Sequence, residues 1–203
     1  NMKRIYTFLY IILWIPLYLF AQKDSKAEEI LKETERFLQS NEGIRAEFET
    51  GEHGLLLMKG EQFYLNCAGI QTWYNGKTQW SYVEANEEVN ISTPTKEELQ
   101  HVNPYLLMKS YKQGYNYKFI GNRTINGKRG YEIILTPQKT QDISSITLFI
   151  SIEYMPLYIK IVQENQSAIE FKVTTCQHSQ HLSDEMFTFD KNKFPDAEII
   201  DLR

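Results

Sequence analysis

Alternation of apolar and polar side chains dominates the chain from residue 44 onward and predicts β-strands. Successive side chains of a strand point to opposite faces, so a period of two marks a sheet with one buried face. The clearest alternation covers residues 146–152, 157–162 and 169–174. Turn residues separate the segments at intervals of roughly 8–12 residues, as in an antiparallel meander. The pattern predicts about ten strands in one antiparallel order.

An amphipathic helix is predicted before the first strand, over residues 25–40. Its apolar residues recur at helical spacing and form one stripe on an otherwise charged segment. Ser25 and Glu28 have the spacing of a capping box, which predicts that Ser25 begins the helix. A helix with one apolar face needs a surface to cover, and the sheet provides it.

Two short helices are predicted in the middle of the chain, where the strand pattern stops. Thr95 and Glu98 repeat the capping-box spacing. Asn103, followed by a proline, predicts the start of a second helix that ends near Gly114. That helix carries three adjacent large apolar residues, Leu106, Leu107 and Met108. These three side chains occupy much of the circumference of the helix. The helix must therefore be buried on more than one side or form a cover over other apolar groups.

An Asn-Gly pair between two aromatic runs is the strongest turn signal in the chain. Asn75-Gly76 predicts a two-residue type I′ hairpin turn, because both central residues of that turn need a positive φ. In that register three aromatic side chains share one face: Trp73, Trp80 and Tyr82. A face this aromatic needs a large apolar partner, which is either an ordinary core or a cavity for a hydrophobic ligand.

The elements together predict a mainly β (α+β) fold. About ten twisting strands curl towards a barrel rather than staying flat. We expect a single curled antiparallel sheet that forms an unclosed β-barrel, with an N-terminal helix and a short central helical lid over an apolar cavity. Such a cavity suits a hydrophobic ligand. The residues expected in the cavity and lid are Phe48, Trp73, Trp80, Tyr82, Leu106, Leu107, Met108, Ile146, Leu148 and Ile150.

The N-terminal segment has the pattern of a secretory signal peptide. Lys3 and Arg4 precede an apolar run that ends at Ala21. An uncleaved membrane anchor is the alternative, because the run is only slightly shorter than a membrane span. We expect residues 1–21 to be a cleaved signal peptide, with Asn1 a remnant of the numbering, and residues 22–203 to form one exported, periplasmic domain. No cysteine lies at the cleavage region, so a lipidated N-terminus is not expected.

Composition excludes few functions. The formal net charge is −4, which argues against a nucleic-acid partner. Export would permit a disulfide between Cys67 and Cys176, but we expect two free thiols that behave as small hydrophobic groups.

Motifs of catalysis are missing from the sequence. It has no nucleophile elbow, P-loop or H-E-x-x-H pattern. Cys176, His178 and His181 are spaced like part of a metal site, yet no fourth ligand stands at a comparable spacing. We interpret them as polar loop residues. The sequence therefore predicts no enzyme, no catalytic residue, no metal and no cofactor.

The hairpin Asn75-Gly76-Lys77-Thr78-x-Trp80-x-Tyr82 resembles the DGKT-x-W-x-Y motif of LolA, the family of periplasmic carriers of outer-membrane lipoproteins. Further matches follow the family's order: Ala46-x-Phe48, Asn103-Pro104-Tyr105-Leu106-Leu107, Leu135-Thr136-Pro137 and Phe187-Thr188-Phe189. The closing Ile200-Asp201-Leu202-Arg203 resembles the branch of the family found in Bacteroidetes.

The resemblance implies an open barrel whose cavity takes acyl chains. It implies acylated lipoproteins as cargo, an inner-membrane ABC exporter that loads the carrier, and an outer-membrane acceptor that unloads it; we expect a monomer. The family has K-R-P, with a lid-locking arginine, where this chain has Lys59-Gly60-Glu61. The lock is therefore absent, weaker or supplied elsewhere, with Arg45 as one candidate. The related acceptor LolB is lipidated, and the missing N-terminal cysteine favours the soluble carrier.

Two other functions remain open on the sequence alone. A binding module of the same fold could sense envelope lipids or misassembled envelope proteins without transporting them. An envelope hydrolase would need a catalytic dyad facing the cavity.

Overall fold

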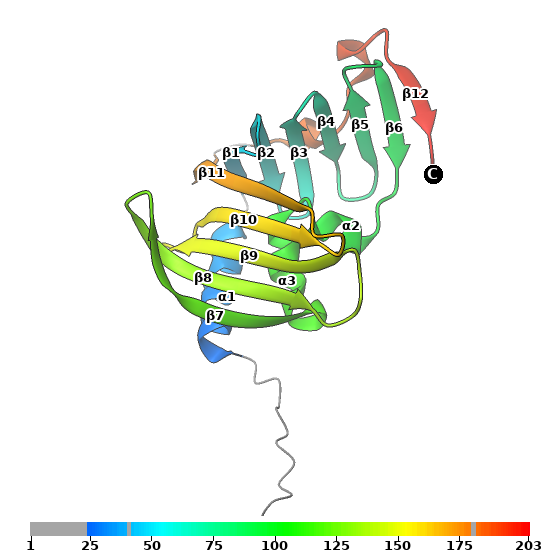
Figure 1. Cartoon of the computed structure of the whole chain (residues 1–203). Coiled ribbons are helices and arrows are strands. Elements are labelled where there is room, and N and C mark those ends of the chain that lie inside the picture. The colour runs from blue at the N-terminus through cyan, green and yellow to red at the C-terminus, as the bar shows by residue number, and fades with distance from the viewer. Residues whose placement is uncertain (1–23, 40–41, 180–181) are drawn as a thin grey trace, which may run out of the picture.

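One long sheet organises the chain in the computed structural model, which describes residues 24–39, 42–179 and 182–203. Its strands follow the spatial order β12-β6-β5-β4-β3-β2-β1-β11-β10-β9-β8-β7. The sheet curls around the helices, and β7 and β12 stand at its two ends (Figure 1). The strands are β1 (Ile44–Glu49), β2 (His53–Lys59), β3 (Gln62–Cys67), β4 (Ile70–Tyr74), β5 (Gln79–Val83), β6 (Glu88–Ser92), β7 (Tyr115–Ile125), β8 (Lys128–Pro137), β9 (Ile143–Ser151), β10 (Pro156–Gln163), β11 (Ala168–His178) and β12 (Glu198–Asp201).

The predicted mainly β, unclosed architecture is confirmed, with one correction to the pairing. Every pair of neighbouring strands is antiparallel except β12 and β6, which run parallel, so the sheet is mixed. The parallel pair arises because the chain after β11 passes through two 3₁₀ turns, η1 (Asp184–Phe187) and η2 (Lys191–Lys193), before it reaches β6. A parallel neighbour needs such a crossover.

The N-terminal helix α1 (Ser25–Leu38) is capped one residue earlier than the sequence predicted. The carboxylate of Asp24, not the Ser25 hydroxyl, accepts hydrogen bonds from the backbone N–H groups of Lys26 and Ala27, both at 3.0 Å. Its second oxygen accepts from the N–H of Phe119 in the edge strand β7 at 2.9 Å. A carboxylate has acceptor sites enough for both tasks, whereas a hydroxyl does not.

The two central helices begin where their caps predicted. In α2 (Lys96–Gln100), Thr95 and Glu98 form the complete capping box. In α3 (Pro104–Gly114), the Oδ1 atom of Asn103 accepts from the backbone N–H of Tyr105 at 2.9 Å. These helices connect β6 to β7, and α3 lies with α1 against one face of the sheet (Figure 1). No helix within the described residues is both long enough and apolar enough to span a membrane.

The predicted two-residue turn at Asn75-Gly76 is wrong. Trp73 pairs with Trp80, so residues 75–78 form a four-residue loop. Of the Asn-Gly pair only Gly76 has a positive φ, because the Asn75 side chain instead accepts from the N–H groups of Lys77 and Thr78 at 3.0 and 2.9 Å. The register differs by two residues, which preserves the faces, so the aromatic side chains still share one.

The two cysteines are free thiols, as expected. Cys67 lies in β3 and Cys176 in β11, and two strands separate these in the sheet. Three strand spacings amount to about 14 Å, well beyond the reach of a disulfide. The predicted signal peptide, residues 1–21, lies outside the described residues.

Asp24 both caps α1 and accepts a hydrogen bond from the backbone of β7, so its side chain should contribute to stability. Replacing Asp24 with Ala should lower the free energy of unfolding by about 1 kcal/mol, the usual cost of a lost N-cap. Replacing Ser25 with Ala should leave it almost unchanged. Urea denaturation at pH 7 measures both, and an equal loss in the two variants would contradict the assignment of Asp24 as the cap.

The Asp24 contribution should also depend on pH. Burial raises the pKa of this carboxyl, but the three N–H donors outweigh burial and bring the pKa below its usual 3.8. A folded-state pKa below the unfolded value gives stability that is present above about pH 4 and is lost as the pH falls through the folded pKa. The difference between wild type and Asp24→Ala should therefore shrink on acidification.

Candidate functional site

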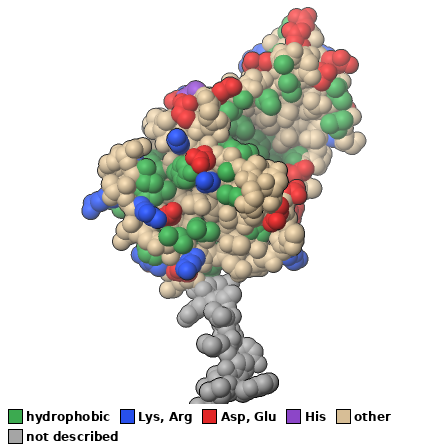
Figure 2. Space-filling view, in the orientation of Figure 1, with side chains coloured by type: hydrophobic (Ala, Val, Ile, Leu, Met, Phe, Trp, Pro, Cys, Tyr) green, Lys and Arg blue, Asp and Glu red, His purple; other side chains and the backbone are tan. Residues whose placement is uncertain are grey.

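An apolar pocket of about 210 Å³ lies between the inner face of the sheet and the central helices. Its floor and walls come from β1, β2, β3, β9, β10 and β11, and its roof comes from residues 100–107 around the start of α3. Figure 2 shows hydrophobic side chains gathered in a hollow in the region that β3, α2 and β11 surround in Figure 1. The lining residues are Leu38, Ile44, Ala46, Phe48, Leu56, Met58, Leu65, Gln100, His101, Val102, Pro104, Leu107, Ile146, Pro156, Ile159, Ile161, Phe171, Val173 and Cys176.

The inner wall of the pocket is produced by the alternation of inward-facing and outward-facing side chains along the strands. Strand β1 alternates buried and half-buried positions, and its buried residues are Ile44, Ala46 and Phe48. The Phe48 ring lies over Gly54 of β2, where an added Cβ atom would come within 2.2 Å of the ring. It also meets Phe171 of β11 edge to face, with ring centroids 5.5 Å apart. A glycine opposite Phe48 thus lets an aromatic ring lie flat along the wall.

Two titratable side chains line the pocket, and both are neutral near pH 7. Burial raises the pKa of the Cys176 thiol to about 12. Burial lowers the pKa of His101, although the carboxylates of Asp142, Glu97 and Glu98 oppose this shift. The pocket therefore offers apolar surface without charge, which suits hydrocarbon rather than an ionic or reacting substrate.

The roof is tied to the β2–β3 turn by polar contacts. Asn103 is fully buried, and its Nδ2 atom donates to the carbonyl oxygens of Gly60 and Glu61 at 3.1 and 3.3 Å. Beside it, Lys109 Nζ of α3 forms an exposed ion pair with Glu61 Oε1 at 3.0 Å. The β2–β3 turn lacks the family's arginine, and the roof residue Asn103 joins the roof to this turn instead.

The suggested role of Arg45 as a lock is wrong. Arg45 pairs with Glu47 two residues along the same strand, at 2.6 Å. It alternates with Ile44 and Ala46, which line the pocket, so its side chain leaves the opposite face of the sheet. Arg45 does not contact the roof.

The structure brings some of the predicted site residues together and separates others. Phe48, Leu107 and Ile146 line the pocket. Met108, Leu148 and Ile150 belong to the same buried cluster but do not line the pocket. Leu106 is half-buried and packs against this cluster.

Trp73, Trp80 and Tyr82 lie on the opposite face of the sheet from the pocket. Thr72 and Tyr74 pair with Leu65 and Phe63, which belong to the inner cluster, so Trp73 between them points outward. Its ring meets Phe189 and Phe194 edge to face at 5.4 and 5.6 Å. Tyr82 packs on Phe194 at 4.6 Å. The partner that this aromatic face requires is the C-terminal segment.

A second and larger space lies beside these rings, with a volume of about 770 Å³. Its lining mixes Trp73 and Phe189 with charged residues in or next to η1 and η2, including Asp184, Asp190 and Lys193. Asp184 is already paired with Lys59 at 3.2 Å. The smaller inner pocket suits hydrocarbon better, because charged groups along a hydrocarbon chain would lose hydration.

Sequence reasoning missed most of the pocket wall. Its inner-face residues in β10 and β11, such as Ile159, Ile161 and Phe171, belong to alternating segments that were recognised as strands. Which strands face the central helices depends on the pairing of β1 with β11, which are more than 110 residues apart in the chain. The roof residue His101 had no sequence signal at all.

The interpretation of Cys176, His178 and His181 as polar loop residues is wrong for Cys176 and His178, because both lie in strand β11, which ends at His178. No group of three or more His, Cys, Asp or Glu residues in the part of the chain that the structure describes could hold an ion. The Nε2 atom of His178 lies 2.9 Å from the carbonyl oxygen of Phe37. His181 itself falls outside the described residues.

Comparison with known folds finds similar structures at low sequence identity. An uncharacterized conserved protein from Thermus thermophilus matches with a TM-score of 0.60 and 15% identity, over 87% of this chain and 99% of that one. LprF from Mycobacterium bovis matches with a TM-score of 0.49 and 10% identity, over 79% and 97%. A LolA superfamily protein from Nitrosomonas europaea gives 0.41 and 11%, over 81% and 98%. At such identities the likeness concerns the fold alone.

Comparison of the sequence with curated proteins and with protein families identifies the family of the chain. No curated protein matches it. The family model described as "Outer membrane lipoprotein carrier protein LolA" matches residues 17–166, about three quarters of the chain. With the open sheet, the inner helices and the ordered motifs already described, this match assigns the family: the chain belongs to the LolA family of outer membrane lipoprotein carrier proteins.

Proposed function

We propose that this protein is a periplasmic carrier that binds the acyl chains of lipoproteins in the inner pocket and moves them from the inner to the outer membrane. The observation that carries the proposal is an uncharged apolar pocket under a roof of short helices. Its partners would be an inner-membrane ABC exporter and an outer-membrane acceptor, and the chain would reach the periplasm through a cleaved signal peptide. The Bacteroidetes-type branch is a further proposal that rests on the sequence motifs.

The size of the pocket indicates that the roof must move. Its 210 Å³ is below the roughly 300–1,000 Å³ of pockets that enclose drug-sized ligands. It can receive part of one chain, whereas a lipoprotein carries several. Loading therefore requires α2 and α3 to move away from the sheet and extend the apolar surface.

The energetics of such a carrier are a compromise. Each buried methylene group contributes about 0.8 kcal/mol, so burial of several acyl chains amounts to tens of kcal/mol before opposing terms. A carrier must bury enough surface to extract the chains, yet release them without an energy source. Opening the roof exposes apolar surface and breaks the Asn103 hydrogen bonds, which offsets part of this gain.

A membrane extraction assay tests the proposal. Inner-membrane vesicles that contain the exporter and a labelled acylated lipoprotein are incubated with the purified protein, and the supernatant is analysed by size-exclusion chromatography. We expect the lipoprotein to appear in a soluble complex with this protein. If acylated and non-acylated forms are retained equally, or the acylated form never leaves the vesicles, the proposal fails.

Filling the pocket should prevent binding of an acyl chain. Replacing Ala46 with Leu adds three carbon atoms to the inner wall without burying a polar group, so the fold should be retained. We expect the affinity for a fluorescent fatty acid to fall by at least tenfold, as measured by titration. The matched control is Ala168→Leu at the exposed start of β11, which should bind as wild type does. Unchanged affinity in Ala46→Leu would place the ligand elsewhere.

Removing the roof contact should loosen the central helices. Replacing Asn103 with Ala removes an N-cap and leaves two carbonyl oxygens without this donor, so we expect a loss of about 1–3 kcal/mol in the free energy of unfolding. Hydrogen exchange in α3 should accelerate more than in α1. Lys109→Ala is the control, because an exposed ion pair contributes about 0–1 kcal/mol. Equal protection of α3 in all three proteins would show that Asn103 does not hold the roof.

A further inference from the structure

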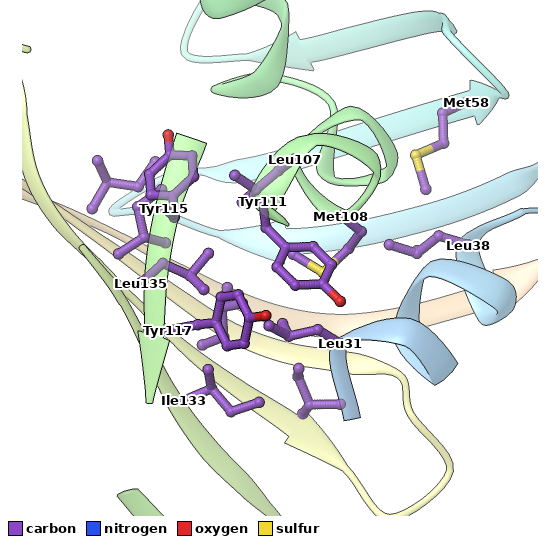
Figure 3. Close-up of a cluster of buried hydrophobic side chains, with 14 of the residues drawn as sticks. Leu31, Leu38, Met58, Leu107, Met108, Tyr111, Tyr115, Tyr117, Ile133 and Leu135 are labelled. Atoms are coloured by element: carbon purple, nitrogen blue, oxygen red, sulfur yellow. The ribbon is translucent and has the colours of Figure 1, made fainter. Parts of the chain in front are cut away.

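A hydroxyl group in the seam between α1 and α3 is buried without a partner. Tyr111 is 1% exposed, and its Oη atom makes no hydrogen bond with any described residue. The neighbouring Tyr117, whose ring meets that of Tyr111 edge to face at 5.1 Å, donates its own hydroxyl to Glu28 Oε2 at 3.4 Å. Figure 3 shows the two rings side by side, with Tyr111 between Leu31 of α1 and Met108 of its own helix.

Phenylalanine would fill the same space without a cost in hydration. Buried side-chain polar atoms in folded proteins nearly always have a hydrogen-bond partner, so an orphan hydroxyl requires an explanation. Leaving a donor unsatisfied in an apolar interior is unfavourable. A partner that enters in another state of the protein would account for the tyrosine.

The Tyr111 ring lies on the path along which the pocket would grow. Leu107, which lines the pocket, is four residues before Tyr111 and so occupies the same face of α3 one turn earlier. Leu38 of α1 also lines the pocket and belongs to the same cluster (Figure 3). A pocket that lengthens between α1 and α3 therefore reaches the Tyr111 hydroxyl.

At the surface beside this cluster an exposed ion pair joins the two helices, between Lys112 Nζ and Glu28 Oε1 at 2.8 Å. The Lys112 ammonium also lies 5.8 Å from the centre of the Tyr111 ring. Tyr111 thus lies where the apolar interior gives way to a charged surface. An exposed pair contributes little, so the cost of separating the helices at this point comes mainly from exposing the apolar side chains between them.

We propose that the Tyr111 hydroxyl donates a hydrogen bond to the ester or amide carbonyl of a bound acyl group, where the chain leaves the apolar interior. This rests on the proposed carrier function and deepens it, because it restricts the ligand to acyl chains and disfavours ether-linked alkyl chains. A carbonyl oxygen is an acceptor and needs the donor that the phenol supplies. Burial, with Glu28 nearby, raises the pKa of Tyr111 and keeps this donor protonated.

The test compares two lipids that differ only at the carbonyl. An ester-linked diacyl phosphatidylglycerol and its ether-linked dialkyl analogue, with equal chain lengths, compete against a fluorescent fatty acid for wild type, Tyr111→Phe and Tyr117→Phe. We expect wild type to prefer the ester by roughly 3- to 10-fold, the effect of one net hydrogen bond. Tyr111→Phe should lose the preference through weaker ester binding, with its ether affinity and its stability to urea retained. Tyr117→Phe should keep the preference.

The outcomes separate this inference from the function on which it rests. If wild type binds both lipids equally, or Tyr111→Phe retains the preference, Tyr111 is not the carbonyl donor and the carrier function stands. If wild type binds neither lipid nor the fluorescent fatty acid, both the inference and the carrier function are overturned.

Discussion

The structure depends on covering the apolar inner face of a curled sheet that does not close. A closed barrel of small radius fills its interior with its own side chains, but here β7 and β12 remain unpaired with each other, and the inner face needs separate elements to shield it. The stripe of α1 and the inner face of α3 supply most of the cover. Where the start of α3 meets the inner faces of β1, β2, β10 and β11 the cover is incomplete, and the remaining space is the pocket.

Polar contacts at the margin decide how firmly that cover is held. The roof meets the β2–β3 turn through Asn103 and Lys109, and α3 meets α1 through Lys112 and Glu28. Of these groups, the Asn103 side chain is fully buried, while the two ion pairs are exposed and screened by salt. Freeing the roof would therefore break the Asn103 contact and expose the apolar face of α3, while the hydrogen bonds between neighbouring strands stay intact. Such an arrangement concentrates motion in the cover, as release of a bound chain would require.

Local chemistry in the sequence predicted the elements well where one interaction dominates. The capping box at Thr95 and the Asn103 cap formed as expected. A second Asn-Gly pair, Asn126-Gly127, forms a two-residue turn with positive φ at both residues. Asn75 differs because its side chain binds nearby backbone N–H groups. The site was harder to predict, since the face that Trp73 takes depends on where the C-terminal segment returns, and the pocket depends on the pairing of β1 with β11. Both are contacts between distant parts of the chain that no local pattern encodes.

The most direct measurement is photo-cross-linking of a bound chain. A fatty acid with a diazirine near its methyl end is incubated with the purified protein and irradiated, and the labelled residues are identified by mass spectrometry. The account predicts labels on the inner face, at Phe48, Ile146 and Leu107. Labels confined to the outer aromatic cluster of Trp73, Phe189 and Phe194 would contradict it.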